Sequence, residues 1–458
     1  MKINLQSRPL LNTGQYTSKL GDYRLYYNPE GYGGVTVVDQ QTSRILDLCD
    51  GNHTVRQLTQ IDGRDPSVVA EEISTLANQE VVFISQQLTN EIHERQKKKG
   101  SMSCWMHLTN RCNLACSYCY IHKSPGDMTT TTGKLIIDKM IESCVAHGIG
   151  SMNIKFAGGE PLLRFELLKE LVDYSKQGSN GKIEVTYTVL TNAALVTEEI
   201  ADYLISHNIG IGVSLDGIGV ENDKSRHDRR GVGSFDRVIA GIETLVRSGK
   251  RPSIMTTVSS DNYLGLLDLT KFLIGGGYRF RFSLQRDCES GWPDLLNHED
   301  ELLHTLHGCY DYMEANLPKD NFAKVHTFGD VKFQRPARRS CGAGNSFFAV
   351  GHDGQIGVCG LGLAKPFASI NDQVDILDLV RQSNPKLADT LASDSPRCNN
   401  CIWRKSCASG CPLQTLATYG RYDRPTPYCR VYREILPRVI RIRGMQMVHA
   451  IAQATQTL

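Results

Sequence analysis

Ten of the fifteen cysteines in this 458-residue chain fall into two groups whose spacing suits iron–sulfur or metal ligation. The first group is the loop Cys112-Asn113-Leu114-Ala115-Cys116-Ser117-Tyr118-Cys119, which directly follows an apolar stretch with the character of a strand. Three thiolates in one loop can ligate three irons of a 4Fe–4S cube and leave the fourth iron without a protein ligand. A zinc knuckle is the alternative, but zinc favours four ligands in closed C-x2-C pairs, and the loop has no fourth cysteine.

A second motif, Phe156-Ala157-Gly158-Gly159-Glu160-Pro161, lies about forty residues further along, after the next apolar stretch. Two glycines let the backbone approach a ligand closely, and carbonyl groups together with Glu160 can face a substrate ammonium. An ordinary turn before a proline-started helix is the alternative. In combination with the cysteine loop, the motif resembles the radical S-adenosylmethionine (SAM) enzymes. The resemblance implies that Cys112, Cys116 and Cys119 hold the cluster that cleaves SAM, and that Gly158, Gly159 and Glu160 bind the SAM amino group.

Further positions extend this resemblance. Tyr118 is an aromatic residue between the last two cysteines, as the family shows, and the resemblance implies that it contacts SAM. Ser214 and Asp216, at the end of the fourth expected strand, are implied to meet the ribose and carboxylate of SAM. Arg226 or Arg230 would add a carboxylate contact, and an exposed arginine is the alternative for either. No side chain is assigned as a catalytic base.

The second cysteine group has the spacing C-x12-G-x4-C, a spacer, and then C-x2-C-x5-C-x3-C-x17-C. This pattern resembles the SPASM extension of radical SAM proteins, whereas paired zinc knuckles would need a second C-x2-C. The resemblance implies two auxiliary 4Fe–4S clusters, and therefore three in all. Residues 342–358 contain no cysteine, so cluster I either has an open iron or is closed by a residue such as Cys288, Cys309 or His352. Cluster I is assigned to Cys341, Cys359 and Cys411, and cluster II to Cys398, Cys401, Cys407 and Cys429.

The elements that must position these residues follow from the alternation of apolar and amphipathic stretches. Six short strands, at 105–108, 152–156, 184–190, 209–215, 253–258 and 280–284, alternate with helical segments such as 133–146 and 164–176. This alternation predicts an α/β fold with parallel strands, closing into a partial (β/α)6 TIM-like barrel. The predicted divisions are an N-terminal unit at 1–92, a linker at 93–103, the barrel at 104–300, a connector at 301–340, the SPASM domain at 341–432 and a terminal helix at 433–458.

The N-terminal unit reads as a strand pair at 23–27 and 35–38 followed by helices and a short strand, which predicts a winged-helix-like α+β domain. It resembles the leader-peptide recognition element of peptide-modifying enzymes, which accepts a leader as an added strand. A generic appendage or a DNA-binding winged helix is the alternative. The unit has no basic stripe, so DNA is disfavoured.

Composition restricts the class of protein. A hydrophobic content of 40% and a charged content of 22% are typical of a soluble globular chain, and a net charge of +2 gives no dominant field for nucleic acid. No apolar run has the length of a signal peptide or of a membrane span. The expectation is a cytoplasmic enzyme without nucleic-acid or membrane partners, whose cysteines are not a disulfide framework.

These features lead to one functional hypothesis. A 5′-deoxyadenosyl radical abstracts hydrogen from a ribosomally made precursor peptide (a RiPP), and a thioether, C–C or ether crosslink follows. Flavodoxin or ferredoxin is the expected reductant. Sulfatase-type formylglycine formation is the alternative enzyme activity, but those enzymes carry an acidic residue where this chain has Gly360. A non-catalytic iron–sulfur electron carrier or leader-binding scaffold is the alternative outside enzymes.

Overall fold

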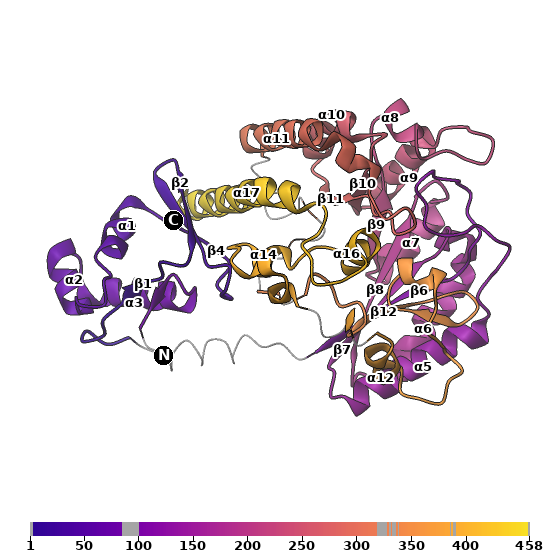
Figure 1. Ribbon diagram of the computed structural model, residues 1–458, viewed down its shortest axis with the longest axis horizontal. Coiled ribbons are helices and arrows are strands. Elements are labelled where there is room, and N and C mark those ends of the chain that lie inside the picture. Colours follow the sequence, from indigo (N-terminus) through magenta and orange to yellow (C-terminus); the bar gives the residue numbers. More distant parts are fainter. Residues whose placement is uncertain are drawn as a thin grey trace.

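The computed structural model describes residues 3–84, 100–317, 328, 331, 336–337, 339–384, 386–387 and 391–456. An N-terminal unit lies at one end of the molecule and an α/β unit at the other, with the long C-terminal helix and the Cys-rich segment between them (Figure 1). The expected linker at 93–103 lies outside the described residues up to 99, and residues 101–103 already belong to a strand. Most of the expected connector beyond 317 is also outside the described residues.

The α/β unit is built on parallel strands that follow one another in chain order across the sheet. This arrangement confirms the expected six β/α repeats, with boundaries shifted by at most a few residues. The strands are β6 (Ser101–His107), β7 (Ser151–Ala157), β8 (Glu184–Thr191), β9 (Gly210–Ser214), β10 (Ser253–Val258) and β11 (Arg279–Leu284).

Helices between these strands bury one face against the sheet (Figure 1). Local signals explain their starts: the Thr129 hydroxyl accepts a hydrogen bond from the backbone N–H of Thr132, which caps α5. Gly133 lets α5 and α6 approach closely, because a Cβ there would lie 2.7 Å from a methyl group of Leu171. The helices are α5 (Thr130–Ala146), α6 (Phe165–Ser179), α7 (Glu198–Ser206), α8 (Val220–Asp223), α9 (Phe235–Arg247), α10 (Leu266–Gly275) and α11 (Glu299–Asn316).

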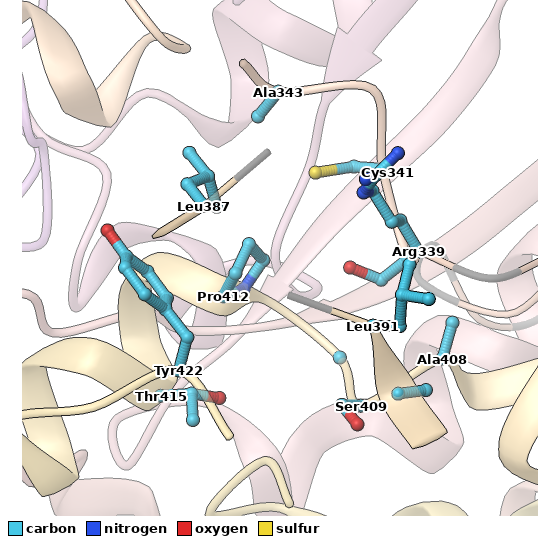
Figure 2. Close-up of a pocket in the computed structure, with 13 residues that line it drawn as sticks. Arg339, Cys341, Ala343, Leu387, Leu391, Ala408, Ser409, Pro412, Thr415 and Tyr422 are labelled. Carbon is cyan, nitrogen blue, oxygen red and sulfur yellow. The ribbon is translucent and has the colours of Figure 1, made fainter. Parts of the chain in front are cut away.

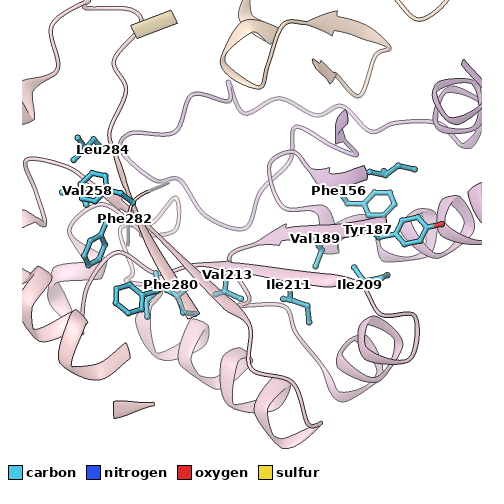
Figure 3. Packing of buried hydrophobic residues seen from close by; sticks show 14 of the residues in the cluster. Phe156, Tyr187, Val189, Ile209, Ile211, Val213, Val258, Phe280, Phe282 and Leu284 are labelled. Carbon is cyan, nitrogen blue, oxygen red and sulfur yellow. The ribbon is translucent and has the colours of Figure 1, made fainter. Parts of the chain in front are cut away.

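The core of this unit consists of the strand residues that alternate toward the helices. Figure 3 shows these side chains gathered along the sheet from Phe156 on β7 to Leu284 on β11. The rings of Phe156 and Tyr187 stack with their centroids 6.4 Å apart. This packing holds neighbouring strands in a single register, and so fixes the loops that follow their carboxyl ends.

A C-terminal hairpin extends the same sheet beyond β6. β12 (Phe347–Val350) pairs in parallel with β6, and β13 (Gln355–Gly357) and β14 (Ala368–Ser369) follow antiparallel. Gly354 has φ +83°, as the turn requires. The pairing of this hairpin with β6 was not predicted from the sequence. Consequently the Cys-rich segment is joined to the strand that leads into the Cys112 loop.

The rest of the Cys-rich segment consists of short helices and loops. All fifteen cysteines lie within the described residues, and none forms a disulfide. The final helix begins at Cys429, a few residues before its expected start. The helices are α12 (Ile376–Gln382), α14 (Pro396–Asn399), α15 (Arg404–Cys407), α16 (Pro412–Tyr419) and α17 (Cys429–Gln456).

The N-terminal unit has its own core beside a three-stranded antiparallel sheet of order β2-β3-β4. The expected strands at 23–27 and 35–38 are found, and a strand before them was missed. Thr54 and Gln57 form a reciprocal capping box at the start of α2. The elements are β1 (Leu10–Leu11), β2 (Tyr16–Leu20), β3 (Tyr23–Tyr27), β4 (Val35–Val38), α1 (Gln40–Asp47), α2 (Val55–Asp62), α3 (Pro66–Asn78) and β5 (Val82–Phe83).

This unit is docked on the C-terminal part of the chain (Figure 1). The Tyr27 and Ser406 hydroxyls lie 2.7 Å apart, and Glu30 forms ion pairs with Arg404 and Lys405. On α17, a Cβ at Gly444 would lie 2.3 Å from a methyl group of Leu25. The N-terminal unit is therefore held against the helix that ends at Cys407. Across the part of the chain that the structure describes, no helix is both long and apolar enough to cross a membrane.

Candidate functional site

The two sequence motifs meet at the carboxyl ends of β6 and β7. These neighbouring strands pair in parallel up to His107 and Ala157, so their loops begin side by side. The backbone N–H of Gly159 donates to the carbonyl of Thr109 at 2.7 Å, and that of Glu160 donates to the carbonyl of Arg111 at 2.9 Å. The glycine-rich turn is thus hydrogen-bonded to the residues that precede Cys112.

Glycine is required in this turn for steric reasons. Gly158 has φ +127°, a conformation that residues with a Cβ rarely adopt. A Cβ at Gly159 would lie 2.0 Å from the carbonyl oxygen of Arg111. The close approach therefore needs two consecutive residues without side chains.

The three cysteines of the first loop lie near one another. Cys116 interacts electrostatically with both Cys112 and Cys119. The loop is fixed from outside, because the N–H of Ala115 donates to the His227 carbonyl at 2.7 Å. Burial raises the pKa of the Cys112 thiol to about 11, so it becomes a thiolate only when a metal replaces its proton.

A lysine that sequence reasoning missed contacts this loop. The Lys123 ammonium donates to the Cys119 sulfur at 3.0 Å. Its position four residues after the last cysteine is the signal that could have pointed to it. A cation at a ligating sulfur stabilises the thiolate and any added electron nearby.

Glu160 is nearly completely buried behind the glycine turn. Its carboxylate accepts hydrogen bonds from the Leu162 N–H (3.1 Å), the Thr191 hydroxyl (2.7 Å) and the Asn192 N–H (2.8 Å). Burial raises the pKa of Glu160, and these three donors act in the opposite direction. Its carboxylate therefore ties the glycine turn to the end of β8.

Asn192 is a further residue that the sequence analysis did not single out. Its side-chain amide donates to the side-chain oxygen (Oδ1) of Asn113 at 2.8 Å, and its backbone N–H donates to the Glu160 carboxylate. Asn192 thus connects the glycine turn with the cysteine loop. Its place directly after a parallel strand was the available signal.

Tyr118, Asp216 and Arg226 form a buried triad with one another. The Tyr118 hydroxyl donates to the Asp216 carboxylate, and the Arg226 guanidinium donates to the Tyr118 oxygen. Arg226 also pairs with Asp216 at 3.3 Å, where Asp216 is fully buried and Arg226 is 6% exposed. Arg226 also interacts electrostatically with Cys116. The triad therefore lies beside the cysteine loop and holds Tyr118, a residue of that loop, in place.

The other two residues expected at this site are placed differently. The Arg230 side chain is 82% exposed and pairs with Asp228 at 3.4 Å, which separates it from the buried Arg226. Ser214 is the last residue of β9 and is half-buried. The structure therefore distinguishes two arginines that the sequence left as alternatives.

The chemistry of this site fits a 4Fe–4S cluster and a polar ligand. Three thiols converge from one loop, as an iron–sulfur cube with an open iron requires. Several buried polar atoms beside the loop have no hydrogen-bond partner among the described residues, namely Asn113 Nδ2, Ser225 Oγ and Arg226 Nε. Buried polar groups without partners are rare in folded proteins, so these atoms are available to a bound ligand.

Electrostatic interactions divide six of the seven cysteines of the second group into two sets. Cys359 interacts electrostatically with Cys411 and Cys341. Cys429 interacts with Cys398 and Cys401. Figure 2 shows the Cys341 thiol pointing into a pocket that is bordered by Ser409 and Pro412, on either side of Cys411. Both sets could hold a metal cluster.

Comparison with known proteins places the site in a family. Residues 106–271 match the radical SAM superfamily. An uncharacterized protein of Methanocaldococcus jannaschii is 33% identical over 237 residues, which are 50% of this chain and 79% of that protein. The chain belongs to the radical SAM superfamily. Members of this superfamily are enzymes that use SAM and a 4Fe–4S cluster, and the chain is therefore an enzyme of this kind.

Other relatives cover more of the chain at lower identity. A cysteine-type anaerobic sulfatase-maturating enzyme of Clostridium novyi is 22% identical and covers 72% of this chain and 93% of its own length. The structure of anSMEcpe with bound AdoMet and a peptide has a TM-score of 0.60 at 20% identity, and covers 75% of this chain and 99% of that one. Streptococcus suis SuiB bound to precursor peptide SuiA has a TM-score of 0.53 at 15% identity, and covers 92% of this chain and 100% of that one. At these identities the two structures show a shared fold.

Proposed function

We propose that this radical SAM enzyme is a maturase of a ribosomally synthesised precursor peptide, with Cys112, Cys116 and Cys119 as the ligands of its SAM-cleaving cluster. When bound, SAM and the cluster supply a 5′-deoxyadenosyl radical that takes a hydrogen atom from the core peptide. Closing an intrapeptide crosslink then requires loss of a second hydrogen as a proton and an electron, and auxiliary cluster I would accept that electron. The type of bond and the residues joined depend on the peptide.

The residues around the glycine turn would bind and orient SAM. The carbonyls of Gly158 and Gly159 lie in a turn that is fixed at both ends and can accept hydrogen bonds from an ammonium group. Asn113 Nδ2 and Ser225 Oγ are buried donors that suit a carboxylate or a ribose. The Tyr118–Asp216–Arg226 triad would hold the loop in place and exclude water beneath it. Ser214 remains a candidate ribose contact.

The Cys-rich segment is proposed to be a SPASM domain with two further 4Fe–4S clusters. Cys341, Cys359 and Cys411 would ligate cluster I, and the second cluster would use Cys398, Cys401, Cys407 and Cys429. The electrostatic groupings of the thiols support this division. Because β12 pairs with β6, the hairpin between Cys341 and Cys359 belongs to the sheet that would carry the SAM site. A flavodoxin or ferredoxin is the proposed electron partner.

The proposal of a peptide substrate rests on the N-terminal unit and on its docking against the C-terminal part of the chain. The fold shared with SuiB covers 92% of the chain, whereas the fold shared with anSMEcpe covers 75%. Residues 3–84 are too large a share of the chain to lie wholly within the remaining 8%, so the likeness to SuiB includes part of this unit. SuiB is bound to a precursor peptide in that structure. A likeness that reaches this unit therefore favours a leader-binding role.

An end strand of this unit offers a place for a leader peptide. β4 is paired with β3 on one side only among the described residues, and an end strand can accept an extended peptide as a further strand. β2, at the other end of the sheet, is partly exposed, and the Arg441 guanidinium donates to its Lys19 carbonyl at 2.9 Å. We therefore take the two end strands, β2 and β4, as the candidate positions for the leader.

Formylglycine formation is less consistent with the site. The acidic residue expected after the second SPASM cysteine is replaced by Gly360, and a Cβ there would lie 2.7 Å from the Tyr120 hydroxyl. An acidic side chain therefore has no room at this position unless Tyr120 moves. A pure electron carrier is also disfavoured, because it would have no use for the glycine turn and the buried donors around Cys112.

The proposal is tested with short peptides encoded beside this gene. The enzyme is co-expressed with the full precursor, with a leaderless core, and as a Cys112→Ala/Cys116→Ala/Cys119→Ala variant. We expect the full precursor alone to lose the mass of two hydrogen atoms per crosslink, and only with the unmodified enzyme. Equal modification of the leaderless core would contradict the role of the N-terminal unit. Modification by the triple variant would contradict the cluster assignment.

A further inference from the structure

The loop after β11 brings one more cysteine toward the proposed auxiliary cluster I. Cys288 lies four residues beyond the end of β11, and its side chain is partly buried. The loop starts in a fixed position, because the Gln285 N–H donates to the Val258 carbonyl at 2.8 Å and the Tyr428 hydroxyl donates to the Gln285 carbonyl at 2.7 Å. Cys288 therefore has a defined position relative to the Cys-rich segment.

A single buried glutamine fastens this loop to the helix that follows Cys411. Gln414, on the first turn of α16, is 1% exposed. Its amide oxygen accepts from the Asp287 N–H at 2.7 Å, and its amide nitrogen donates to the carbonyls of Asp287 (3.0 Å) and Gly291 (3.1 Å). These bonds hold the residue before Cys288 against the start of the helix capped by Cys411.

The close approach of the two segments is also enforced by packing. A Cβ at Gly291 would lie 2.7 Å from the Ala417 carbonyl, and Gly291 has φ +86°. The loop therefore contacts both the beginning and the middle of α16. A loop held this tightly beside a cysteine-bearing helix can present a ligand without rearrangement.

The other cysteines assigned to cluster I lie at the same end of α16. Cys341 lines a pocket together with Ser409, Gly410 and Pro412, the residues around Cys411, and the Gln414 bonds hold the residue before Cys288 to the same helix start. Burial raises the pKa values of the Cys288 and Cys359 thiols, and the neighbouring Cys411 adds to both shifts. Cys288, Cys341 and Cys359 thus form one group around Cys411. Four cysteine ligands complete the coordination of a 4Fe–4S cluster.

The other two residues that could have closed the cluster face elsewhere. Cys309 is fully buried in α11, and its thiol is hydrogen-bonded with Thr270 of α10. The His352 ring lies against Gly126, where a Cβ would be 1.8 Å from the imidazole nitrogen. Among the described residues that were candidates, Cys288 is the one that joins the group.

We propose that Cys288 is the fourth protein ligand of auxiliary cluster I, and that this cluster has no open iron for a substrate. This inference rests on the assignment of Cys341, Cys359 and Cys411 to that cluster in the proposed function. A closed cluster can accept or pass electrons, but it cannot bind a peptide thiolate or amide without losing a ligand. The peptide would then be held by other parts of the enzyme.

The test uses the full chain with Cys112→Ala/Cys116→Ala/Cys119→Ala. These substitutions remove the proposed ligands of the SAM cluster, so that only the auxiliary clusters contribute iron and spectra. Cys288→Ala is compared with Cys309→Ala, a buried cysteine outside the group, and with Cys341→Ala. After anaerobic reconstitution, iron is counted, and electron paramagnetic resonance (EPR) spectra are recorded after mild oxidation. We expect Cys288→Ala, but not Cys309→Ala, to lose one iron readily and give the signal of a 3Fe–4S cluster. Cys288→Ser should keep more of the fourth iron than Cys288→Ala.

Two outcomes separate the failure of this inference from the failure of the proposed function. If Cys341→Ala lowers the iron content, while Cys288→Ala matches Cys309→Ala in iron content and spectrum, the Cys288 ligand is wrong and the cluster assignment stands. If Cys341→Ala also leaves the iron unchanged, the assignment of cluster I itself is wrong. A 3Fe–4S signal of equal size in the parent with Cys288 intact would show that the site is open, and would overturn the inference.

Discussion

Replacing Arg226 with methionine should destabilise the α/β unit far more than the same change at Arg230. Arg226 is 6% exposed and balances the fully buried Asp216 carboxylate at 3.3 Å. Removing one partner of a buried ion pair leaves an uncompensated charge and costs about 3–5 kcal/mol. The Arg230 side chain is 82% exposed, so its loss should leave stability unchanged within error.

A double variant separates loss of charge balance from loss of packing. In Arg226→Met/Asp216→Asn the buried charge disappears with its partner, and the amide oxygen can still accept from the Thr257 N–H, as the carboxylate does at 2.8 Å. We therefore expect the double variant to recover part of the stability that the single variant loses. Arg226→Met should also retain iron at the Cys112 loop less well, because Tyr118 loses its donor.

The assay is hydrogen exchange of the anaerobic holoenzyme, read on peptides that cover β9 and the Cys112 loop. Local exchange reports the free energy of opening of this part of the chain, which a global midpoint of a multidomain protein would not. Indistinguishable exchange in Arg226→Met and Arg230→Met would show that Arg226 does not stabilise this part of the chain by balancing the Asp216 charge. A double variant less stable than the single variant would show that packing, rather than charge, controls the effect.

Three further predictions concern the same region. Gly159→Ala should abolish SAM binding measured by equilibrium dialysis, since a Cβ there would lie 2.0 Å from a carbonyl oxygen, whereas Gly275→Ala, which meets nothing within 4 Å, should not. Lys123→Met should lower the reduction potential of the SAM cluster in an EPR-monitored titration, because the cation that contacts the Cys119 sulfur is lost; an unchanged potential would contradict this. Burial lowers the pKa of His107 to about 4, and an unfolded imidazole titrates near 6.5. The unfolded state therefore binds the extra proton between these values, and stability falls by about 1.4 kcal/mol at most for each pH unit below about 6.5. The opening free energy of β6 in His107→Asn, measured by hydrogen exchange and corrected for the intrinsic exchange rate at pH 7 and pH 5, should depend less on pH than in the unmodified chain, and an equal dependence would contradict this.

The parallel strands and the helix between each pair could be predicted because their apolar periodicity is local. The Cys112 loop and the glycine turn could also be expected to meet, since neighbouring parallel strands end at one edge of the sheet. By contrast, the pairing of β12 with β6 joins residues that are far apart in sequence, and no local pattern marks it. Strand β2 was missed because the polar Ser18 occupies one of its inward positions, so the sequence lacks a clear apolar alternation although burial does alternate along the strand.

The sequence predicted which residues belong to the candidate site, but it did not predict which residues they contact. Tyr118, Asp216 and Arg226 were each expected to contact SAM, yet the structure shows them bonded to one another. Such a triad is a tertiary arrangement, so residue types alone do not reveal it. Cys288 is a similar case, since only the clamp formed by Gln414 distinguishes it from the other cysteines outside the motifs.

The Cys112 loop is proposed to hold the cluster that cleaves SAM. The most direct test of this proposal is 5′-deoxyadenosine formation from SAM by the reconstituted, reduced protein under anaerobic conditions. We expect 5′-deoxyadenosine and methionine from the unmodified chain and from Cys288→Ala, and none from Cys112→Ala/Cys116→Ala/Cys119→Ala. No product from the unmodified chain with a full iron complement, or undiminished product from the triple variant, would contradict the account.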